Sequence, residues 1–577
     1  MRCGRLKNYL EELLLVARGV APADVLLKDA QVVNTFVGKV ERTGVAIFGE
    51  KIAGVGEYTK AKQVIDLKGA FLLPGFINGH THVESSMLHP ARYAQAVVPR
   101  GTLTVITDLH EISNVCGEAG IEFFLRWSQK VPLDIFVMVP SCVPATRLET
   151  SGARITARKM KKILANPNVI GLGEMMDFPG VVRGEKEVIR KLVIFQDKVI
   201  DGHAPGLGGK ELNAYLSVGI RSDHECTTCE EAKEKLLRGM YIMIREGSSE
   251  KNLDALLPLI TENTYKRCLF VVDDRSCSDL VREGDIDAVV RRAISKGFDP
   301  VRAICMATIN VAEYFRLYDR GAIAPGYLAS LITVNDLRKL DVDMVFYRGK
   351  LVAKEGKPLF SLPEITAELT HTVRMRRLAS ELLSLPAKRR KRGEEIYPVI
   401  EIVPGQIITR KRKERMAVAD GKILPDVERD ILKLVVVERH RASGNIGVGL
   451  VNGFGLKKGA LASSVAHDSH NVVAVGTNDL DILRAIEEVE RLQGGLVVCA
   501  DGNILASLPL PIAGLLSPEP LESVVEQHGK VEQAAASLGN LPPAPFSILS
   551  FLALPVIPEL RLTDLGLVDV KELRLVN

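Results

Sequence analysis

Eight short apolar runs, separated by segments long enough to form helices, follow one another between residues 71 and 274. They are Phe71–His82, Thr102–Asp108, Asp134–Pro140, Asn168–Glu174, Val199–His203, Ile220–Glu225, Tyr241–Glu246 and Cys268–Asp274. Continuous apolar runs of this length are typical of parallel strands that are covered on both faces. Because the runs alternate with helix-sized segments, the sequence predicts an α/β fold with a (β/α)8 barrel of the TIM type.

The regions on both sides of these runs carry turn signals that predict β-hairpins. The turns are at residues 49–51, 348–350, 420–422 and 501–503. The first apolar segment, from Leu6 to Val16, contains Glu11 and Glu12 and predicts an amphipathic helix rather than a signal peptide. The segment Lys388–Glu395 is expected to be an exposed linker. The region after it predicts a mixed α/β domain with a helix at Leu480–Leu492.

Composition narrows the range of partners. The net charge of the 577-residue chain is +4, which is too small to indicate a nucleic-acid partner. Two basic runs, Lys388–Arg392 and Arg410–Lys413, are expected to be solvated. No run reaches the ~20 apolar residues that a membrane span needs. Nine cysteines without a regular spacing indicate reduced thiols in a cytoplasmic protein.

Polar side chains with metal-ligand chemistry stand where the predicted strands end. His80 and His82 close the first run, and alternate residues of a strand point to the same face. The other runs end in Glu174, His203, His224, and the pair Asp273 and Asp274. The carboxyl ends of barrel strands meet on one face, where active sites are built. Four of the eleven histidines and two or three carboxylates therefore predict a site for two divalent metal ions.

These and other motifs resemble the amidohydrolase superfamily, and in finer detail its adenine deaminases of bacteria and archaea. The superfamily motifs are PGFINGHTH at residues 74–82 and GAIAPG at residues 321–326. The finer resemblance rests on HVESSM (82–87), DLHEISNVCG (108–117), GLGEMM (171–176), DGHAPGL (201–207), SDHE (222–225), GNIGVGLVNGFGL (444–456) and SSVAHDSHN (463–471). The similarity extends over nearly the whole chain.

The resemblance implies a barrel, a small β-domain built from both of its flanks, and a further C-terminal domain. The corresponding divisions are residues 1–70, 71–325, 326–390 and 391–577. It also implies hydrolysis of adenine to hypoxanthine and ammonia at two divalent metal ions, with Mn²⁺ or Fe²⁺ favoured and Zn²⁺ possible. The implied ligands are His80, His82, Glu174, His203, His224 and Asp273. Glu174 stands where many relatives have a bridging modified lysine.

Roles in the reaction follow from its chemistry. Asp273 is expected to carry a proton from the attacking water. An acid must protonate the purine ring, and Glu225 and the pair His110 and Glu111 remain alternatives for it. Further residues expected to contact or orient the substrate are Glu84, Ser85, Arg245, Glu246, Asp274, Arg275, His467, Asp468 and His470. The last three come from a segment that could be a lid or pocket wall, a third metal site or a polar network. His467 and His470 could share one side of a helical turn.

Three residues at two places depart from the family pattern. Ser276 and Cys277 replace a histidine and a proline beside the predicted pocket, and Ser330 replaces an aspartate after the APG motif. An amidohydrolase that opens a cyclic amide, or that acts on another 6-substituted purine, is the alternative function, because its metal site would be nearly the same. A non-catalytic barrel is the least favoured. The expected partners are adenine and further copies of the chain, with a dimer favoured.

Overall fold

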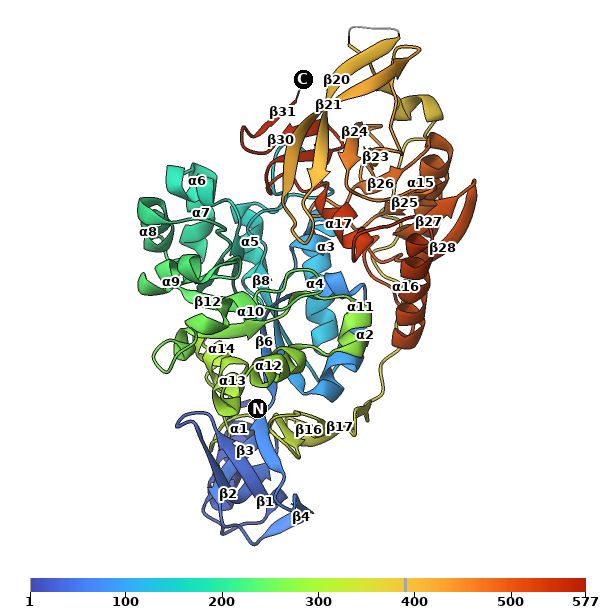
Figure 1. Ribbon diagram of the computed structural model, residues 1–577. Helices are drawn as coiled ribbons and strands as arrows, with labels where there is room; N and C mark the ends of the chain where they lie inside the picture. The colour runs from blue at the N-terminus through green and yellow to red at the C-terminus, as the bar shows by residue number, and fades with distance from the viewer. Residues whose placement is uncertain (1, 389–391, 577) are drawn as a thin grey trace.

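The computed structural model describes residues 2–388 and 392–576. Most of the basic run Lys388–Arg392 lies outside these residues. Figure 1 shows three parts along one long axis, namely a small β-domain, a central barrel and a C-terminal domain. No helix in the part of the chain that the structure describes is long and apolar enough to cross a bilayer.

The central part is the predicted barrel. Its strands are β6 (Phe76–His82), β7 (Thr102–Asp108), β8 (Asp134–Val139), β9 (Val169–Met175), β10 (Val199–Gly202), β11 (Ser222–Asp223), β12 (Tyr241–Arg245), β13 (Cys268–Val271) and β14 (Asp273–Asp274). They form two parallel sheets, in the orders β10–β9–β8–β7–β6–β14 and β11–β12–β13. The backbone amide of Arg221 donates to the carbonyl of Ile200 at 3.2 Å and links β10 to β11, so the ring is closed.

Helices surround this ring. They are α2 (Pro90–Val97), α3 (His110–Cys116), α4 (Glu118–Ser128), α5 (Ala157–Ile163), α6 (Phe178–Arg183), α7 (Lys186–Ile194), α8 (Gly209–Ser217), α9 (Cys229–Leu237), α10 (Leu253–Leu256), α11 (Cys277–Arg282), α12 (Ile286–Ser295), α13 (Pro300–Met306) and α14 (Ile309–Tyr314). Inside the ring, Ile77, Ile106, Met138, Met243 and Leu269 belong to one buried cluster. The barrel interior is therefore a packed core, as expected for this fold.

Two of the predicted strands are each divided in the structure. The run Phe71–His82 forms β5 (Phe71–Pro74) in the small β-domain and β6 in the barrel, with Gly75 between them. A Cβ atom at Gly75 would lie 2.6 Å from Leu103, so only glycine fits this crossing between two sheets. The last run breaks at Val272, whose amide donates to the Asn78 side chain at 3.3 Å instead of to a neighbouring strand.

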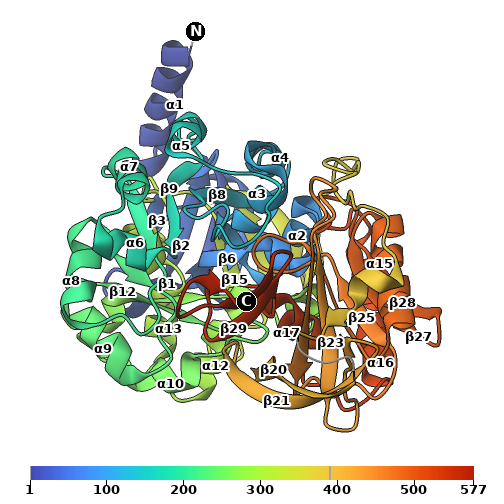
Figure 2. The same ribbon diagram turned by 90° about the horizontal axis from the view of Figure 1, so that it is seen from above.

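The small β-domain combines both flanks of the barrel in one sheet. Its strands are β1 (Ala23–Asn34), β2 (Lys39–Phe48), β3 (Lys51–Gly56), β4 (Ala61–Asp66), β5, β15 (Leu331–Val334), β16 (Val342–Tyr347), β17 (Lys350–Lys354) and β18 (Lys357–Pro358). The predicted hairpins join β2 to β3 and β16 to β17. The predicted first helix is α1 (Arg2–Ala17), which projects from the body in Figure 2 and packs through Val16.

The C-terminal domain is a sheet with helices on it. The strands are β19 (Leu385–Pro386), β20 (Gly393–Ile402), β21 (Thr409–Ala419), β22 (Lys422–Ile423), β23 (Ile431–Val437), β24 (Ile446–Asn452), β25 (Ala460–Ser463), β26 (Val472–Gly476), β27 (Gly495–Ala500) and β28 (Asn503–Pro509), followed by a small sheet of β29 (Leu560–Thr563), β30 (Gly566–Asp569) and β31 (Arg574–Leu575). The helices are α15 (Asp479–Leu492), where one was predicted, α16 (Leu521–Ala536) and α17 (Pro545–Phe551). The hairpins β21–β22 and β27–β28 are also confirmed.

The predicted linker Lys388–Glu395 is wrong in part. Gly393 to Glu395 already belong to β20 and pair with β21, because Gly393 lies opposite Val418 in that hairpin. Residues 410–413 form an exposed stretch of β21, as expected for a solvated basic run.

The C-terminal domain lies against the barrel. The Asn471 side chain donates to the carbonyl of Thr150 at 2.8 Å, and the amide of Thr150 donates to Asp564 at 2.8 Å. The Thr563 hydroxyl donates to the carbonyl of Leu148 at 2.6 Å. These contacts hold the loop after β25 over the carboxyl ends of the barrel strands.

Candidate metal centre and active site

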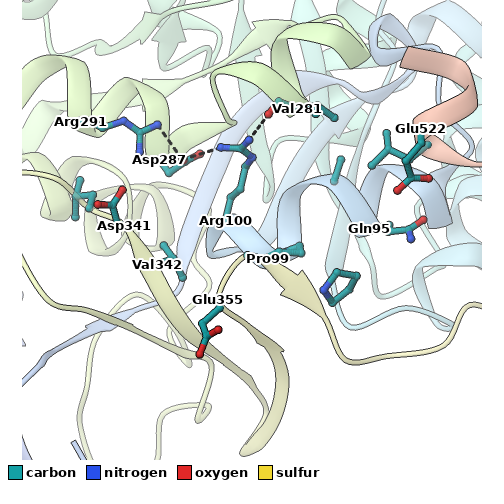
Figure 3. A pocket seen from close by; sticks show the side chains of 15 residues that line it. Gln95, Pro99, Arg100, Val281, Asp287, Arg291, Asp341, Val342, Glu355 and Glu522 are labelled. Atoms are coloured by element: carbon teal, nitrogen blue, oxygen red, sulfur yellow. Dashed lines mark hydrogen bonds and ion pairs between the residues drawn. The ribbon is translucent and has the colours of Figure 1, made fainter. Parts of the chain in front are cut away.

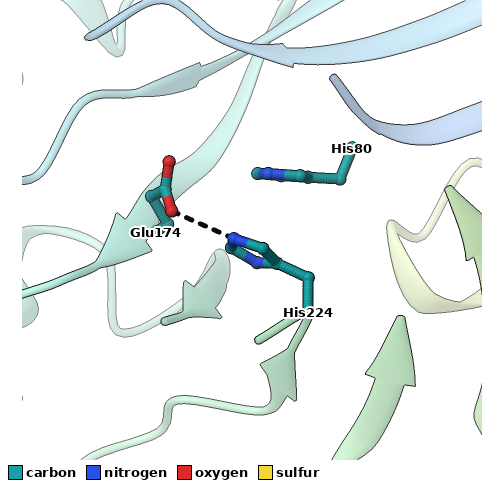
Figure 4. Close-up of side chains that lie close together, drawn as sticks. All are labelled: His80, Glu174 and His224. Carbon is teal, nitrogen blue, oxygen red and sulfur yellow. Dashed lines mark ion pairs between the residues drawn. The ribbon is translucent and has the colours of Figure 1, made fainter. Parts of the chain in front are cut away.

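The side chains at the strand ends converge on one buried site. His80 and His82 lie in β6, Glu174 lies in β9, and Asp273 begins β14. His203 and His224 directly follow β10 and β11. Figure 4 shows the imidazoles of His80 and His224 and the carboxylate of Glu174 pointing toward one another from three strands. The structure thus brings together all six residues that the sequence identified as possible ligands.

Glu174 lies between two groups of histidines. Its Oε1 is 3.4 Å from His82 Nε2, whereas its Oε2 is 2.7 Å from His203 Nδ1 and 3.2 Å from His224 Nε2. Asp273 Oδ1 lies 3.6 Å from His80 Nε2 and 3.3 Å from His82 Nε2. Glu174 therefore turns one carboxylate oxygen toward His82 and the other toward His203 and His224, while Asp273 lies beside His80 and His82.

The donor set fits divalent cations. His80 Nε2 is buried and has no hydrogen-bond partner among the described residues, although it faces Asp273. His82 Nδ1 is 3.0 Å from the carbonyl of Asp108 and must donate to it, so Nε2 is the nitrogen that is left to bind a cation when the ring is neutral. Imidazole nitrogens and carboxylate oxygens together suit Mn²⁺, Fe²⁺ and Zn²⁺.

The two carboxylates are held ionised. Burial alone would raise the pKa of Glu174, but hydrogen bonds from His110, His203 and His224 outweigh it and hold the pKa well below its usual range. Burial is likewise outweighed at Asp273 by His80, His82 and Arg245, so its pKa is also well below the usual range. Asp273 has a left-handed backbone with φ of 64°, a conformation that is costly for a residue other than glycine and is common at functional sites.

Arg245 connects Asp273 to Glu225. Its NH1 donates to Asp273 Oδ2 at 2.7 Å and to Glu225 Oε1 at 2.5 Å, and its NH2 donates to Glu225 Oε2 at 3.1 Å. Burial would raise the pKa of Glu225, but the Arg245 charge and two histidines lower it overall. Glu225 is therefore an anion that accepts hydrogen bonds, which is a poor state for a general acid.

The C-terminal domain closes the cavity above the strand ends. The lining residues from the barrel are His82, His110, Glu111, Glu174, Met176, His203, His224, Glu225, Arg245, Glu250, Asp273 and Asp274. Those from the C-terminal domain are Ile407, His467, Asp468, Phe551, Leu554, Val556 and Ile557. His467 and Asp468 thus form a pocket wall, as the favoured interpretation of their segment expected. The apolar part of this wall and Glu250 carry no sequence motif that could have identified them.

The segment of His467 to His470 is not helical. It forms a turn between β25 and β26, and its two histidines face the same carboxylate, Glu111 of α3. The two histidines therefore lie on one side, as expected, but in a turn and not in a helix; the amide of His470 donates to the carbonyl of Ala466 at 2.7 Å.

Several predicted substrate contacts lie outside the cavity. Glu84 Oε1 accepts from the amide of Ile112 at 3.1 Å, and the Ser85 hydroxyl donates to Asp274. Arg275 donates to the carbonyl of Glu246 at 2.9 Å and to Glu283 at 2.7 Å. The polar groups of Glu84, Ser85 and Arg275 are thus used in fixing neighbouring loops. None of these three residues lines the cavity, whereas Asp274, the partner of Ser85, does. His470 is also absent from the lining residues and supports the wall from behind.

The family departures are structural. The Ser276 hydroxyl accepts from the amide of Asp279 at 3.2 Å and caps α11, and Cys277 is fully buried. The Ser330 hydroxyl accepts from the amide of Arg348 at 3.3 Å. Asp108 is a residue that the sequence reasoning missed, because its role is indirect: its Oδ2 accepts from the amide of Glu174 at 2.9 Å and orients that ligand.

A separate cleft of about 460 Å³ lies between the barrel, the small β-domain and α16. In Figure 3 its charged groups bind one another, since Arg100 and Arg291 both pair with Asp287. None of its lining residues is one of the strand-end histidines, and three more carboxylates, those of Asp341, Glu355 and Glu522, also line it.

Arg561 organises the apolar wall and gives a first prediction. It is fully buried and donates to the carbonyls of Ile557 at 2.7 Å, Phe551 at 2.9 Å and Ile407 at 2.5 Å. All three of these residues line the cavity. Lysine cannot reach three divergent carbonyls, so Arg561→Lys is expected to raise KM for the substrate about tenfold while metal content stays unchanged. Steady-state kinetics with metal analysis checks this, and an unchanged KM would contradict it.

Comparison with known proteins identifies the family. The model of the amidohydrolase family matches residues 71–352, and that of the adenine deaminase C-terminal domain matches residues 406–574. An adenine deaminase of Dehalococcoides mccartyi is 59% identical over 99% of both chains. Adenine deaminase 2 of Carboxydothermus hydrogenoformans is 51% identical over 97% of this chain and 98% of its own. A solved structure of an adenine deaminase covers 57% of this chain and 99% of its own at 19% identity, with a TM-score of 0.45. The chain therefore belongs to the amidohydrolase family and, within it, to the adenine deaminases.

Proposed function

We propose that this protein hydrolyses adenine to hypoxanthine and ammonia, a reaction of purine salvage. The observation that carries the proposal is the convergence of four histidines and two carboxylates under a wall supplied by the adenine-deaminase C-terminal domain. The relatives that match over the full chain are adenine deaminases.

Two divalent cations are proposed for the site, with Mn²⁺ or Fe²⁺ favoured over Zn²⁺. His80, His82 and Asp273 would hold one, His203 and His224 the other, and Glu174 would bridge them. When bound, such ions lower the pKa of a water molecule towards neutrality, so that hydroxide is available at pH 7.

Asp273 is proposed to move the proton that the reaction releases. Its Oδ1 faces the histidine ligands, while its Oδ2 accepts from Arg245 at 2.7 Å, so the carboxylate is fixed beside the position of the attacking water. It would take one proton from the water as oxygen adds to C6 and pass that proton to the departing amino group, which leaves as ammonia.

Purine recognition is proposed for groups that remain ionised or polar around the cavity. Glu225 is kept as an anion by Arg245 and can accept a hydrogen bond from an N–H of adenine. Asp274 and Asp468 also line the cavity, and burial raises the pKa of Asp468 to about 6. The apolar wall around Phe551 excludes water from the ring.

Ammonia release separates this function from the alternatives. The protein loaded with Mn²⁺ or with Fe²⁺ under reducing conditions should convert adenine to hypoxanthine with one ammonia per purine. Hydantoin and dihydroorotate, which lose a ring bond instead of an amino group, should be left intact. If the protein opens the ring of either compound and leaves adenine unchanged, the cyclic-amide alternative is correct. If it acts on other 6-substituted purines and not on adenine, the second alternative, a hydrolase for such a purine, is correct.

The remaining expectations concern assembly and location. We propose a homodimer, because Leu6, Leu10 and Leu14 recur every four residues on one face of α1 and are exposed. Light scattering of the metal-loaded protein would decide this. All eight cysteines whose side chains the structure describes are free thiols, which supports a reducing compartment such as the cytoplasm.

A further inference from the structure

Three histidines surround the carboxylate of Glu111 at the boundary between the barrel and the C-terminal domain. His467 Nδ1 is 2.5 Å from Glu111 Oε1, and His110 Nε2 is 3.0 Å from the same oxygen. His470 Nε2 contacts Glu111 Oε2 from the other side. Glu111 is almost fully buried, and the charges of His467, His470 and His110 outweigh burial and hold its pKa well below the usual range. It is therefore a fixed anion between two domains.

The protonation of His470 follows from its other nitrogen. The amide of Ala466 donates to His470 Nδ1 at 3.1 Å, so Nδ1 carries no proton and Nε2 carries one. The protonated Nε2 of His470 contacts Glu111 Oε2, and it has no lone pair there for a metal ion. This tautomer argues against a third metal site in the segment. The role that the geometry leaves to His470 is to fix the orientation of Glu111.

Glu111 in turn fixes His467. A carboxylate only accepts, so His467 donates Nδ1–H to Glu111. The imidazole stacks on Phe551 with ring centroids 4.7 Å apart and planes 22° apart. Both rings line the cavity, and within the described chain no residue hydrogen-bonds to His467 Nε2. A carboxylate on one nitrogen and an open cavity at the other is the arrangement of an oriented acid or base.

We propose that His467 is a catalytic residue that donates its Nε2 proton to ring nitrogen N1 of adenine as water adds to C6, with Glu111 as its positioning residue. The step rests on the proposed deamination. The new O–C6 bond forms, the C6–N1 π electrons move to N1, and N1 takes the proton from His467 while Asp273 takes one from water. As ammonia leaves with the Asp273 proton, the hydroxyl proton at C6 is released and His467 is protonated again from solvent. Hypoxanthine keeps the proton on N1.

The charged groups around His467 suit an acid. Glu111 faces it from α3, Asp274 from β14, and Asp468 and His470 from its own loop, while α17 contributes only Phe551 and the Ser550 hydroxyl. Burial lowers the pKa of His467, but Glu111 and the two aspartates outweigh it and raise the pKa to about 9. His467 is thus charged below pH 9 and loses its proton above it, so kcat/KM should fall on the alkaline side of about pH 9.

His467→Gln tests this in the full chain loaded with Mn²⁺. We expect kcat for adenine to fall ~10²- to 10⁴-fold, with KM within a few-fold, two metal ions still bound and the alkaline limb of the pH profile lost. In Glu111→Gln the limb should move to lower pH, because the charge that raises the His467 pKa is gone. His440→Gln is the matched control, since His440 Nε2 donates to the Ser469 carbonyl at 2.7 Å in the same loop but does not line the cavity.

Each outcome is decisive. A His467→Gln enzyme with kcat within threefold of the parent, or with an unchanged alkaline limb, would overturn the proposal. So would an equal loss in His440→Gln, which would mean that the interface and not the imidazole is responsible. A parent protein that binds metal but leaves adenine unchanged would instead overturn the proposed function.

Discussion

Glu174→Ala is expected to abolish measurable adenine deamination. The variant removes the one carboxylate that contacts histidines of both groups, at 3.4 Å from His82 and 2.7 Å from His203. Without it neither cation is bridged, and the four histidines repel one another when protonated. Loss of metal assistance worth several kcal/mol corresponds to a fall in kcat/KM of about 10³- to 10⁴-fold or more.

Metal analysis after gel filtration, alongside the ammonia assay, checks this expectation. Glu149→Gln is a suitable control, because burial raises the pKa of Glu149 to about 8 and its carboxyl is already neutral at pH 7. Glu149 does not line the cavity. A Glu174→Ala protein that keeps two metal ions and more than a tenth of the parent activity would show that Glu174 is not the bridge.

Asp273→Asn is expected to separate metal binding from proton transfer. The amide oxygen can still face His80 and His82, but the residue can no longer accept a proton at neutral pH. We expect kcat to fall ~10²- to 10⁴-fold, with at least one metal ion retained. The loss should not recover at any pH between 5 and 10, because asparagine does not titrate there.

The control for this variant is Asp285→Asn. Asp285 is also a buried barrel aspartate, accepts from Thr102 at 2.7 Å and does not line the cavity. Its substitution should leave kcat unchanged even if it lowers stability. Full activity of Asp273→Asn with both metal ions bound would exclude Asp273 as the proton carrier.

The barrel and the convergence of its strand-end side chains were predictable from the pattern of apolar runs. Strand periodicity places His80 and His82 on one face, and the convergence of strand ends brings Glu174, His203 and His224 to them. No comparable rule gives the exact strand limits. The first run passes from one sheet to the other at Gly75, where a Cβ atom would lie 2.6 Å from Leu103 of the next strand, and such a tertiary contact cannot be read from the run itself.

The pocket wall that the C-terminal domain supplies could not be predicted from the sequence either, because it too depends on tertiary contacts. Ile407 and Phe551 are ordinary apolar residues 134 and 278 positions after Asp273, and only the fold brings them over the strand ends. The chemical state of Glu225 was equally hidden. Glu225 could act as the acid that protonates the purine ring only if no cation held it ionised. Its bidentate contact with Arg245 is visible only in three dimensions.

Titration of the metal-free protein with Mn²⁺ is the most direct measurement of the central claim. Adenine turnover, followed as equal amounts of hypoxanthine and ammonia, should rise with added metal and reach a plateau at two ions per chain. A chelator should reverse it. Full adenine turnover in the absence of divalent metal, or no turnover with two ions bound, would contradict the account.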